Sequence, residues 1–457
     1  MGKPFRIKGV KDSLRAVAWR MVTTTLLAAV AMGMPLFDDV VTASASESVP
    51  VAAQLMLTKA ARLMEKKEYQ QAVDTLLAFQ AKGDAPSVGR SDPRGHHHPL
   101  IYFALGNGYL MLENLSRAEN AYREALERNP DNADAWMNLA GACYRQEKYA
   151  DAARSFLKAY ETAAEKKPER LFYGAAAYLN AGDHQRSIAV FESLLAAHPD
   201  RIEPAWKENL IHALLAADQS QRALPHIIEL VQTYEGDDKI RWQEILLQQY
   251  LALDMNNEAL ALVMALTRDH PLASRWWKAL AHVHLTASRY EEALAALTIY
   301  SWLAVPTEEE QKLLADLFLQ VDIPVKAAPI YTAMLHHKTD RHLLQHLVIA
   351  YQRLGRPEEA LEHLEKFARH VPDPSVGMLK GDLLYELGRY EDAADVYRQV
   401  AQTDAQHTGR AWLMAGYAAW QMNDLNGSRT AFERAAGFSD QKKAALAAMR
   451  RIEQNRQ

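Results

Sequence analysis

The chain has 457 residues, of which 49% are hydrophobic and 24% charged, and its formal net charge at pH 7 is −5. The apolar content is enough for a large core, and length alone would predict about three domains. A mild acidic excess without a long basic stripe argues against nucleic acid as a partner. The single cysteine, Cys143, cannot form a disulfide within the chain, and we expect it to be a small buried hydrophobic residue.

The first 45 residues combine a basic segment, an apolar run and a pattern of small residues. Lysine or arginine stands at positions 3, 6, 8, 11, 15 and 20, and an apolar run extends from Met21 to Phe37. Ala43-Ser44-Ala45 then provides a small-x-small cleavage pattern. This order predicts a secretory signal peptide over residues 1–45, and the alternative is an uncleaved N-terminal membrane anchor. In both cases the basic residues before the run predict that the rest of the chain lies outside the cytoplasm.

A sequence repeat follows. Two segments that start 34 residues apart (136 against 102) match position by position. They are Tyr102-x2-Leu105-Gly106-x2-Tyr109-x8-Ala118-x3-Tyr122 and Trp136-x2-Leu139-Ala140-x2-Cys143-x8-Ala152-x3-Phe156. Large residues come early in each unit and small residues midway, and a proline often stands near the end. A period of this length predicts helix–turn–helix units that stack into a solenoid.

The repeat extends over nearly the whole chain after residue 45. We number each unit so that its recurring small residue, such as Ala118 or Ala152, is position 20. The eleven resulting units start at Ala53, Pro99, Ala133, Pro168, Pro204, Ile240, Ser274, Glu308, Arg341, Pro374 and Gly409. Residues 46–80 form a first, degenerate unit, residues 81–98 a loop insertion containing Gly, Pro and Ser, and residues 99–440 ten further units. An alanine-rich segment with basic residues predicts a capping helix and tail over residues 441–457.

Each unit has the same predicted chemistry. Position 20 is Ala or Ser in each unit and position 8 is Gly or Ala in most of them, so the two helices of a unit can approach closely. Positions 4, 7, 11, 24 and 27 are mostly bulky and apolar, and their three- and four-residue spacing predicts one apolar stripe per helix.

This pattern resembles the tetratricopeptide repeat (TPR). The resemblance implies an all-α, right-handed superhelical solenoid of about eleven units with a C-terminal capping helix. It also implies a protein that binds other proteins, because in TPR proteins positions 2, 5, 9, 12 and 13 of the first helices line a groove that accepts a peptide or protein segment. Carried onto this sequence, the predicted groove contains Leu100, Phe103, Asn107, Met137, Tyr144, Phe172, His212, Lys278, His282 and Tyr417.

No pattern in the chain predicts catalysis. A phosphate-binding loop, a metalloprotease motif, a nucleophile elbow and a Cys-x-x-Cys pair are all missing from the sequence, so we expect no enzyme activity and no cofactor. Two histidine groups are the nearest approach to a site: His96 to His98, and His336, His337, His342 and His346. We expect the first group to be a solvated loop. Metal binding is the alternative for both groups, because imidazoles bind transition metals.

The expected function is a non-catalytic scaffold or adaptor in the periplasm. The layout of an N-terminal signal followed by repeats resembles the TPR proteins that accompany TonB–ExbB–ExbD systems, which implies an envelope transport or energy-transduction complex. One alternative is a subunit that recruits an enzyme for cell-wall or polysaccharide assembly, and another is a carrier of outer-membrane precursors. An uncleaved N-terminus would place the chain in the inner membrane with the solenoid outside the cytoplasm.

Overall fold

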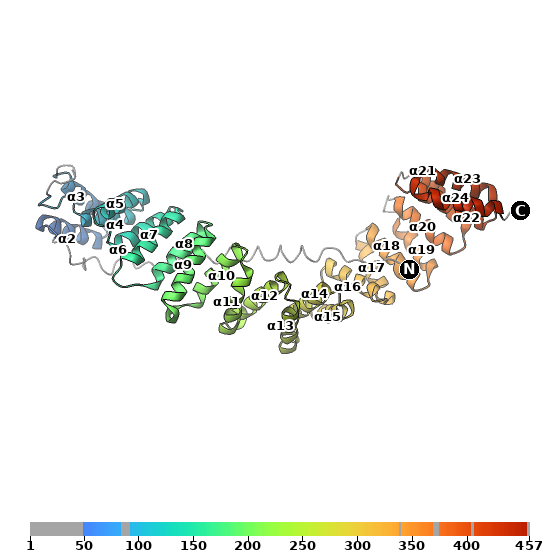
Figure 1. Cartoon of the computed structure of the whole chain (residues 1–457), viewed down its shortest axis with the longest axis horizontal. Helices are drawn as coiled ribbons and strands as arrows, with labels where there is room; N and C mark the ends of the chain where they lie inside the picture. Colours follow the sequence, from blue (N-terminus) through green and yellow to red (C-terminus); the bar gives the residue numbers. More distant parts are fainter. Residues whose placement is uncertain (1–48, 84–91, 338–339, 369–373, 404–405, 455–457) are drawn as a thin grey trace. The chain divides into compact units, whose positions relative to one another are not determined.

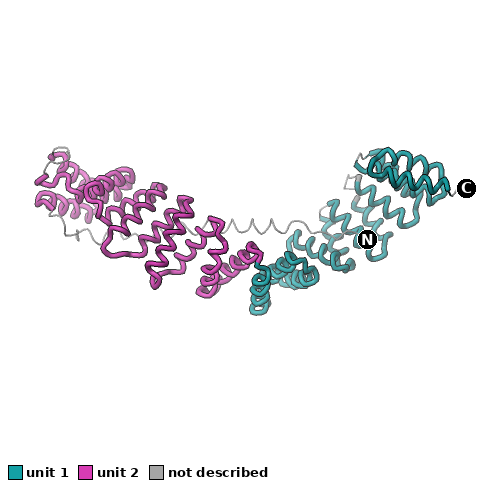
Figure 2. Tube along the Cα trace, in the orientation of Figure 1, with its two compact units in different colours: residues 1–12, 255–457 teal, residues 13–254 magenta. Residues whose placement is uncertain are grey.

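This computed structural model describes residues 49–454, except 84–91, 338–339, 369–373 and 404–405. The predicted signal peptide or anchor therefore lies outside the described residues. The described residues form two compact units, residues 49–254 and residues 255–454 (Figure 2). Within them the regular secondary structure is 23 α-helices and one short 3-10 helix, with no β-strand (Figure 1). The all-α prediction is confirmed.

Residues 49–254 contain α2 (Val51–Glu65), α3 (Tyr69–Gln80), α4 (Pro99–Met111), α5 (Leu115–Arg128), α6 (Ala133–Arg145), α7 (Tyr149–Thr162), α8 (Pro168–Asn180), α9 (His184–Ala197), η1 (Pro199–Arg201), α10 (Pro204–Ala216), α11 (Ser220–Thr233) and α12 (Gly236–Ala252). Within this unit each helix packs mainly on the helices before and after it in the chain, as a solenoid requires.

Residues 255–454 contain α13 (Asn256–Asp269), α14 (Ser274–Thr286), α15 (Tyr290–Leu303), α16 (Glu308–Gln320), α17 (Pro324–His337), α18 (Arg341–Arg353), α19 (Pro357–Ala368), α20 (Pro374–Glu386), α21 (Tyr390–Thr403), α22 (Thr408–Gln421), α23 (Leu425–Ala436) and α24 (Ser439–Gln454). Helix α24 packs on α22 and α23 through Ala445, Ala448 and Ile452, and its other side is mostly polar. Ten of the eleven predicted helix pairs pack within one compact unit, and the helices of the remaining repeat, α12 and α13, belong to different units. The predicted C-terminal capping helix is present, while the right-handed sense of the superhelix stays a prediction.

The helices begin where the sequence provides a start signal. Eight of the first helices, α4, α6, α8, α10, α14, α16, α18 and α20, begin at the predicted first residue of their units. Asn132 caps α6, and Thr307 and Glu310 form a capping box at α16. These side chains accept hydrogen bonds from backbone N–H groups that have no partner inside the helix.

The turn between the two helices has the same backbone conformation in every repeat. Position 15 has a positive φ, between 56° and 74°, in all eleven units. Only three of these residues are glycine, and the others are Lys67, Glu113, Glu147, Asp218, Asp254, Ser288, Asp322 and Asn423. The left-handed conformation costs a non-glycine residue roughly 1 kcal/mol. The packing of the helices on either side therefore imposes this turn even where the residue does not favour it.

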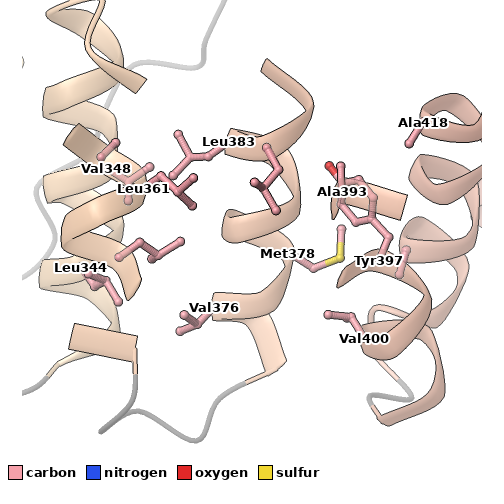
Figure 3. Packing of buried hydrophobic residues seen from close by; sticks show 14 of the residues in the cluster. Leu344, Val348, Leu361, Val376, Met378, Leu383, Ala393, Tyr397, Val400 and Ala418 are labelled. Carbon is pink, nitrogen blue, oxygen red and sulfur yellow. The ribbon is translucent and has the colours of Figure 1, made fainter. Parts of the chain in front are cut away.

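The small positions allow each helix pair to pack closely. All eleven residues at position 20 are fully buried. Where that residue is Ser187 or Ser428, its hydroxyl donates to the carbonyl of Ala175 or Gly416 at position 8, in each case at 2.9 Å. Figure 3 shows part of the resulting core in residues 255–454, where Leu344, Leu383 and Tyr397 come from three different helices. Among the described helices, none is both long enough and apolar enough to cross a membrane.

Candidate functional site

In each compact unit the candidate site is the row of side chains at positions 2, 5, 9, 12 and 13 of the first helices, here called the first-helix row. The structure divides the ten predicted groove residues between the two compact units. Helix α4 holds Leu100, Phe103 and Asn107, α6 holds Met137 and Tyr144, α8 holds Phe172 and α10 holds His212, all in residues 49–254. Helix α14 holds Lys278 and His282 and α22 holds Tyr417, all in residues 255–454.

Phe103 and Met137 form the partly exposed apolar part of the row in residues 49–254. Both lie against a buried cluster that includes Tyr122 and Leu139, and both keep part of their surface outside it. Phe103 also contacts the ring of Tyr122, with ring centroids 6.0 Å apart. Large apolar side chains that remain partly exposed at neighbouring repeats can contact an apolar partner.

Phe172 occupies the equivalent of Phe103 two repeats later, but its surroundings differ. Its ring stacks on Trp206 of α10, with centroids 5.2 Å apart and an interplanar angle of 17°. Only 8% of Phe172 is exposed, so this side chain mainly joins two neighbouring repeats. Whether it also contacts a partner stays a prediction.

Asn107, at position 9, is buried, and its side chain is hydrogen-bonded within its own repeat. Its Oδ1 accepts from the Tyr122 hydroxyl at 2.8 Å and from the amide of Asn138 on the next first helix at 2.9 Å. The same bond joins position 24 to position 9 in two other units, from Tyr331 to Asp316 and from Tyr397 to Asp382, each at 2.6 Å. In the sequence, tyrosine at position 24 occurs only where position 9 is Asn or Asp, a signal that could have identified this pair in advance.

Side chains at positions 12, 13 and 15 make contacts between neighbouring repeats. The amide of Asn180 donates to the Tyr144 hydroxyl at 2.6 Å, and the amide of Gln421 donates to the equivalent Tyr385 hydroxyl at 3.3 Å. Arg145 pairs with Glu113 of the preceding unit at 2.8 Å. Arg353 makes the same pair with Asp322, at 3.5 Å. These side chains near the C-terminal ends of the first helices are therefore paired within the chain.

Lys278, at position 5, lies beside a buried carboxylate. Its Nζ is 2.5 Å from Oε1 of Glu310. The other oxygen of this carboxylate, Oε2, accepts from the Tyr300 hydroxyl and from the Thr307 backbone N–H, each at 2.8 Å. Burial opposes ionisation of Glu310, but these donors outweigh it and lower its pKa to about 2. The ammonium group of Lys278 is thus paired inside the chain.

A second acidic cluster surrounds Asp316. This buried carboxylate accepts from Lys312 and Tyr331, each at 2.6 Å, and its Oδ1 is 3.0 Å from Nδ1 of His346 on α18. Burial raises the pKa of Asp316, but the hydrogen bonds from His346, Lys312 and Tyr331 outweigh it, so the pKa lies below its usual value. Sequence analysis named His346 only as a metal candidate and missed this cluster, because its members come from three helices.

The two central histidines of the row are largely neutral at pH 7. Burial lowers the pKa of His212 and of His282, and nearby Glu208 and Glu310 only partly offset this effect. Nδ1 of His282 is buried and has no hydrogen-bond partner among the described residues. Tyr417 lies edge-on to Phe432, with ring centroids 5.1 Å apart.

The expectation of a solvated loop at His96 to His98 is wrong. His96 is buried against Phe79, with ring centroids 4.7 Å apart, and His97 Nδ1 is 2.9 Å from the Tyr102 hydroxyl. His98 caps α4, because its Nδ1 accepts from the backbone N–H of Leu100. Packing against Phe79 of the first repeat therefore buries His96. In the part of the chain that the structure describes, no group of three or more His, Cys, Asp or Glu residues is arranged to hold a metal ion.

Cys143 is fully buried, which confirms the expectation of a small packed side chain. Burial raises the pKa of its thiol to about 11, and so the reactive thiolate is suppressed at neutral pH.

Two family models, both described as tetratricopeptide repeat, match the chain. One matches residues 103–170, 248–300, 347–408 and 378–445, and the other matches residues 171–201. Together they span more than half of the sequence. Comparison with curated protein sequences gives no match.

The chain also matches solved structures at low similarity. A structure of Naa15/Naa10 bound to HypK-THB is 15% identical with a TM-score of 0.41, and the match covers 87% of this chain and 60% of that one. A tetratricopeptide repeat protein from Parabacteroides merdae is 14% identical with a TM-score of 0.30, covering 55% and 98% of the two chains. MamA AMB-1 is 19% identical with a TM-score of 0.30, covering 39% and 96%. Similarities this low identify no partner.

The repeat period, the helix pairs with their shared turn, and the family matches agree over most of the described residues. The chain belongs to the tetratricopeptide repeat proteins.

Proposed function

We propose that this protein is a non-catalytic scaffold that binds a protein or peptide segment along the first-helix row of α4 and α6. The observation that carries the proposal is the pair of partly exposed apolar side chains, Phe103 and Met137, at positions that need not be apolar for repeats to stack. Phe172 is buried and several polar residues of the row are paired within the chain, whereas Phe103 and Met137, like Leu100 on α4, keep part of their apolar surface exposed. An extended or helical segment with apolar anchors fits such a surface.

A photoreactive amino acid placed at Phe103 tests this assignment. We expect crosslinking in cells to yield a defined protein product, identified by mass spectrometry. The matched control is the same amino acid at Met264, an exposed apolar residue on the second helix α13. Equal products from both positions would contradict the assignment.

The double variant Phe103→Ser with Met137→Ser provides an independent test. Loss of two apolar anchors should weaken binding of the crosslinked partner at least about tenfold, since anchor residues of this kind contribute most of the binding energy. The control is Met422→Ser, which removes an exposed apolar side chain from the α22–α23 turn. Unchanged affinity in the double variant would show that the partner binds elsewhere.

We further propose that the scaffold is exported to the periplasm and acts within an envelope transport or energy-transduction complex. The support is the order of basic segment, apolar run and small-residue site in residues 1–45. Sequencing the N-terminus of the mature protein should show cleavage after Ala45. Retention of Met1 or Gly2 would instead favour the anchored form in the inner membrane.

The crosslinked products also distinguish the alternatives. One stable membrane-complex subunit is the expected product. A synthase of cell-wall or polysaccharide assembly would indicate an enzyme-recruiting subunit, and many unfolded outer-membrane chains would indicate a carrier.

A further inference from the structure

Helix α2 exposes the face that the other first helices use for stacking. In the other ten repeats the first helix packs on the second helix of the preceding repeat, and a Cβ atom at Gly108, at position 10, would overlap Val73 of α3. Position 10 is buried in all ten of those repeats, and position 3 is buried in nine. Helix α2 is the first helix that the structure describes (Figure 1), and its residues at these positions, Leu55 and Arg62, are exposed.

Five exposed side chains form a stripe along this face. Their spacing of three or four residues places them on one side of the helix, opposite the buried Ala53 and Ala60. We call the five residues the α2 stripe: Val51, Leu55, Lys59, Arg62 and Lys66. The first two are large apolar side chains that are 83% and 64% exposed, and the last three are cations.

The charge of the α2 stripe has one sign. Lys59, Arg62 and Lys66 make no ion pair with the residues that the structure describes. The only acid of α2, Glu65, is at position 13 and therefore belongs to the first-helix row. The stripe thus combines two exposed apolar side chains with three available positive charges.

The role of α2 as the first helix of a solenoid explains only half of this pattern. A terminal repeat needs a polar outer face, and cations near a helix C-terminus stabilise the helix dipole. Neither reason explains the exposure of Val51 and Leu55. The capping helix α24 differs, because its outer side carries Asp440 and Glu453 as well as bases, and its most exposed large apolar residue, Leu446, is 38% exposed.

We propose that the α2 stripe binds the surface of a membrane that contains anionic phospholipids. Val51 and Leu55 insert at the boundary between headgroups and acyl chains, and the three cations contact the lipid phosphates. The net charge of the chain is −5, so an anionic surface attracts a locally basic face such as this stripe and thereby orients α2. All five side chains come from one helix, whereas the predicted peptide groove is lined by several helices, so a flat surface suits the stripe better than a peptide.

The inference is independent of the proposed partner binding and of signal cleavage. The stripe uses none of positions 2, 5, 9, 12 and 13, so the first-helix row stays available. Residues 51–66 remain in the chain whether or not residues 1–45 are removed. In the uncleaved form the apolar run ends at Phe37, 14 residues before Val51 (51 against 37), and a stretch of that length can span up to about 45 Å to the same bilayer.

An environment-sensitive fluorophore on Leu55→Cys in the purified chain tests the contact. Cys143 is fully buried, so the introduced thiol is the accessible one. Vesicles of phosphatidylcholine with about one-third phosphatidylglycerol should shift the emission to shorter wavelength and raise it at least about twofold, whereas phosphatidylcholine alone should not. The matched control is the same label on Met264→Cys, an exposed residue of α13. No shift at residue 55, or an equal shift at both residues, overturns the proposal.

Removing the three cations tests the electrostatic part. Each basic residue near an anionic surface strengthens binding roughly fivefold, so the triple change should raise the lipid concentration for the half-maximal shift about a hundredfold. The triple variant is Lys59→Gln, Arg62→Gln and Lys66→Gln, and its control removes the same charge from exposed residues of α24 through Lys442→Gln, Lys443→Gln and Arg450→Gln. Unchanged helical circular dichroism shows that both variants are folded. Equal weakening in both would show that overall charge drives binding, which overturns the assignment to α2.

A photoreactive amino acid at Leu55 distinguishes a membrane from an acidic protein of matching charge. Crosslinking in cells should yield phospholipid adducts, detected by mass spectrometry of the protein. A defined protein adduct without lipid would show that the α2 stripe binds an acidic protein surface and would overturn the proposal.

Discussion

Residues 49–254 and residues 255–454 use the same repeat with different polar chemistry along the first helices. In the former, Tyr122 at position 24 donates to the neutral amide of Asn107. In the latter, the equivalent tyrosines, Tyr331 and Tyr397, donate to the carboxylates of Asp316 and Asp382. The backbone and the tyrosine are the same, and only the charge of the acceptor changes.

That change alters what the first helices can present to a partner. A buried carboxylate requires cations or strong donors, and here Lys312 and His346 surround Asp316 while Arg410 pairs with Asp382. These basic side chains are occupied within the chain. Where the acceptor is the neutral Asn107, no cation is needed, and the apolar Phe103 and Met137 stand beside it. In these repeats a charged acceptor at position 9 is accompanied by basic side chains that are paired within the chain.

The largest expected effect concerns a packing contact between positions 8 and 24 that occurs within repeats of both regions. A Cβ atom at Gly416 or Gly106 would overlap the ring of Phe432 or Tyr122, respectively. Gly416→Val and Gly106→Val should each reduce the free energy of unfolding by about 3 kcal/mol, since neither ring can move without disturbing the core. Denaturant unfolding checks this. Phe432→Leu should partly rescue Gly416→Val, as Ala281 already stands opposite Leu297. A large difference between the two glycine variants would contradict a common packing.

The second-largest effect is expected on acidification, and it concerns Glu310 in residues 255–454. The pKa of Glu310 is about 2 in the folded chain, below the ordinary 4.5 of an unfolded glutamate. Its stabilising contribution is therefore complete above about pH 4.5 and is lost as the pH falls towards 2. Glu310→Gln should remove about 2–3 kcal/mol at pH 7 and much less at pH 3. Hydrogen exchange of α14 to α16 measures this locally, and an equal effect at both pH values would contradict the ion pair.

A smaller effect is expected when the hydroxyl of the tyrosine at position 24 is removed, and it compares the two regions at the same repeat position. Tyr331→Phe removes a donor to a carboxylate and should cost about 2 kcal/mol, whereas Tyr122→Phe removes a donor to an amide and should cost about 1 kcal/mol. Local hydrogen exchange of the two repeats provides the measurement. Equal costs would show that the charge of the acceptor is well compensated by Lys312 and His346 alone.

The turns should show the smallest effect, and it is stabilising. Ser288→Gly and Lys67→Gly each place glycine at a positive φ, 57° and 63°. Both changes should raise the free energy of unfolding by up to about 1 kcal/mol, because the left-handed strain is relieved at some cost in chain entropy. Thermal unfolding checks the sign. The same result is expected in both units, since the turn geometry does not differ between them.

Much of the fold could be read from the sequence because the repeat encodes contacts that are local. The small residue at position 20 and its partner at position 8 lie 12 residues apart, so every unit records their close approach in its own sequence, as Ser187 and Ala175 show. Helix starts were equally predictable, because Pro99, Pro168 and the Thr307 capping box act on their own first turns. The solvated histidine loop was the wrong prediction, because burial of His96 depends on Phe79 in the preceding helix pair.

The candidate site was less predictable. Phe103 and Phe172 share one repeat position, yet Trp206 in the following repeat buries only Phe172. A position number assigns a side chain to a helix face but does not say which neighbour reaches it. For the same reason, Lys278 appeared available for a partner until Glu310, 32 residues later (310 against 278), was found beside it.

The sequence by itself determined the family, the helix pairs and the small positions at which they meet, because those contacts recur within each unit of about 34 residues. Only the tertiary structure decided which polar and apolar side chains of the first helices are paired with neighbours and which remain exposed. That outcome depends on contacts between different repeats, where Asp316 meets His346 and Phe172 meets Trp206. Repeats that share one pattern still differ at these contacts, and a single unit's sequence does not contain its neighbour's side chains.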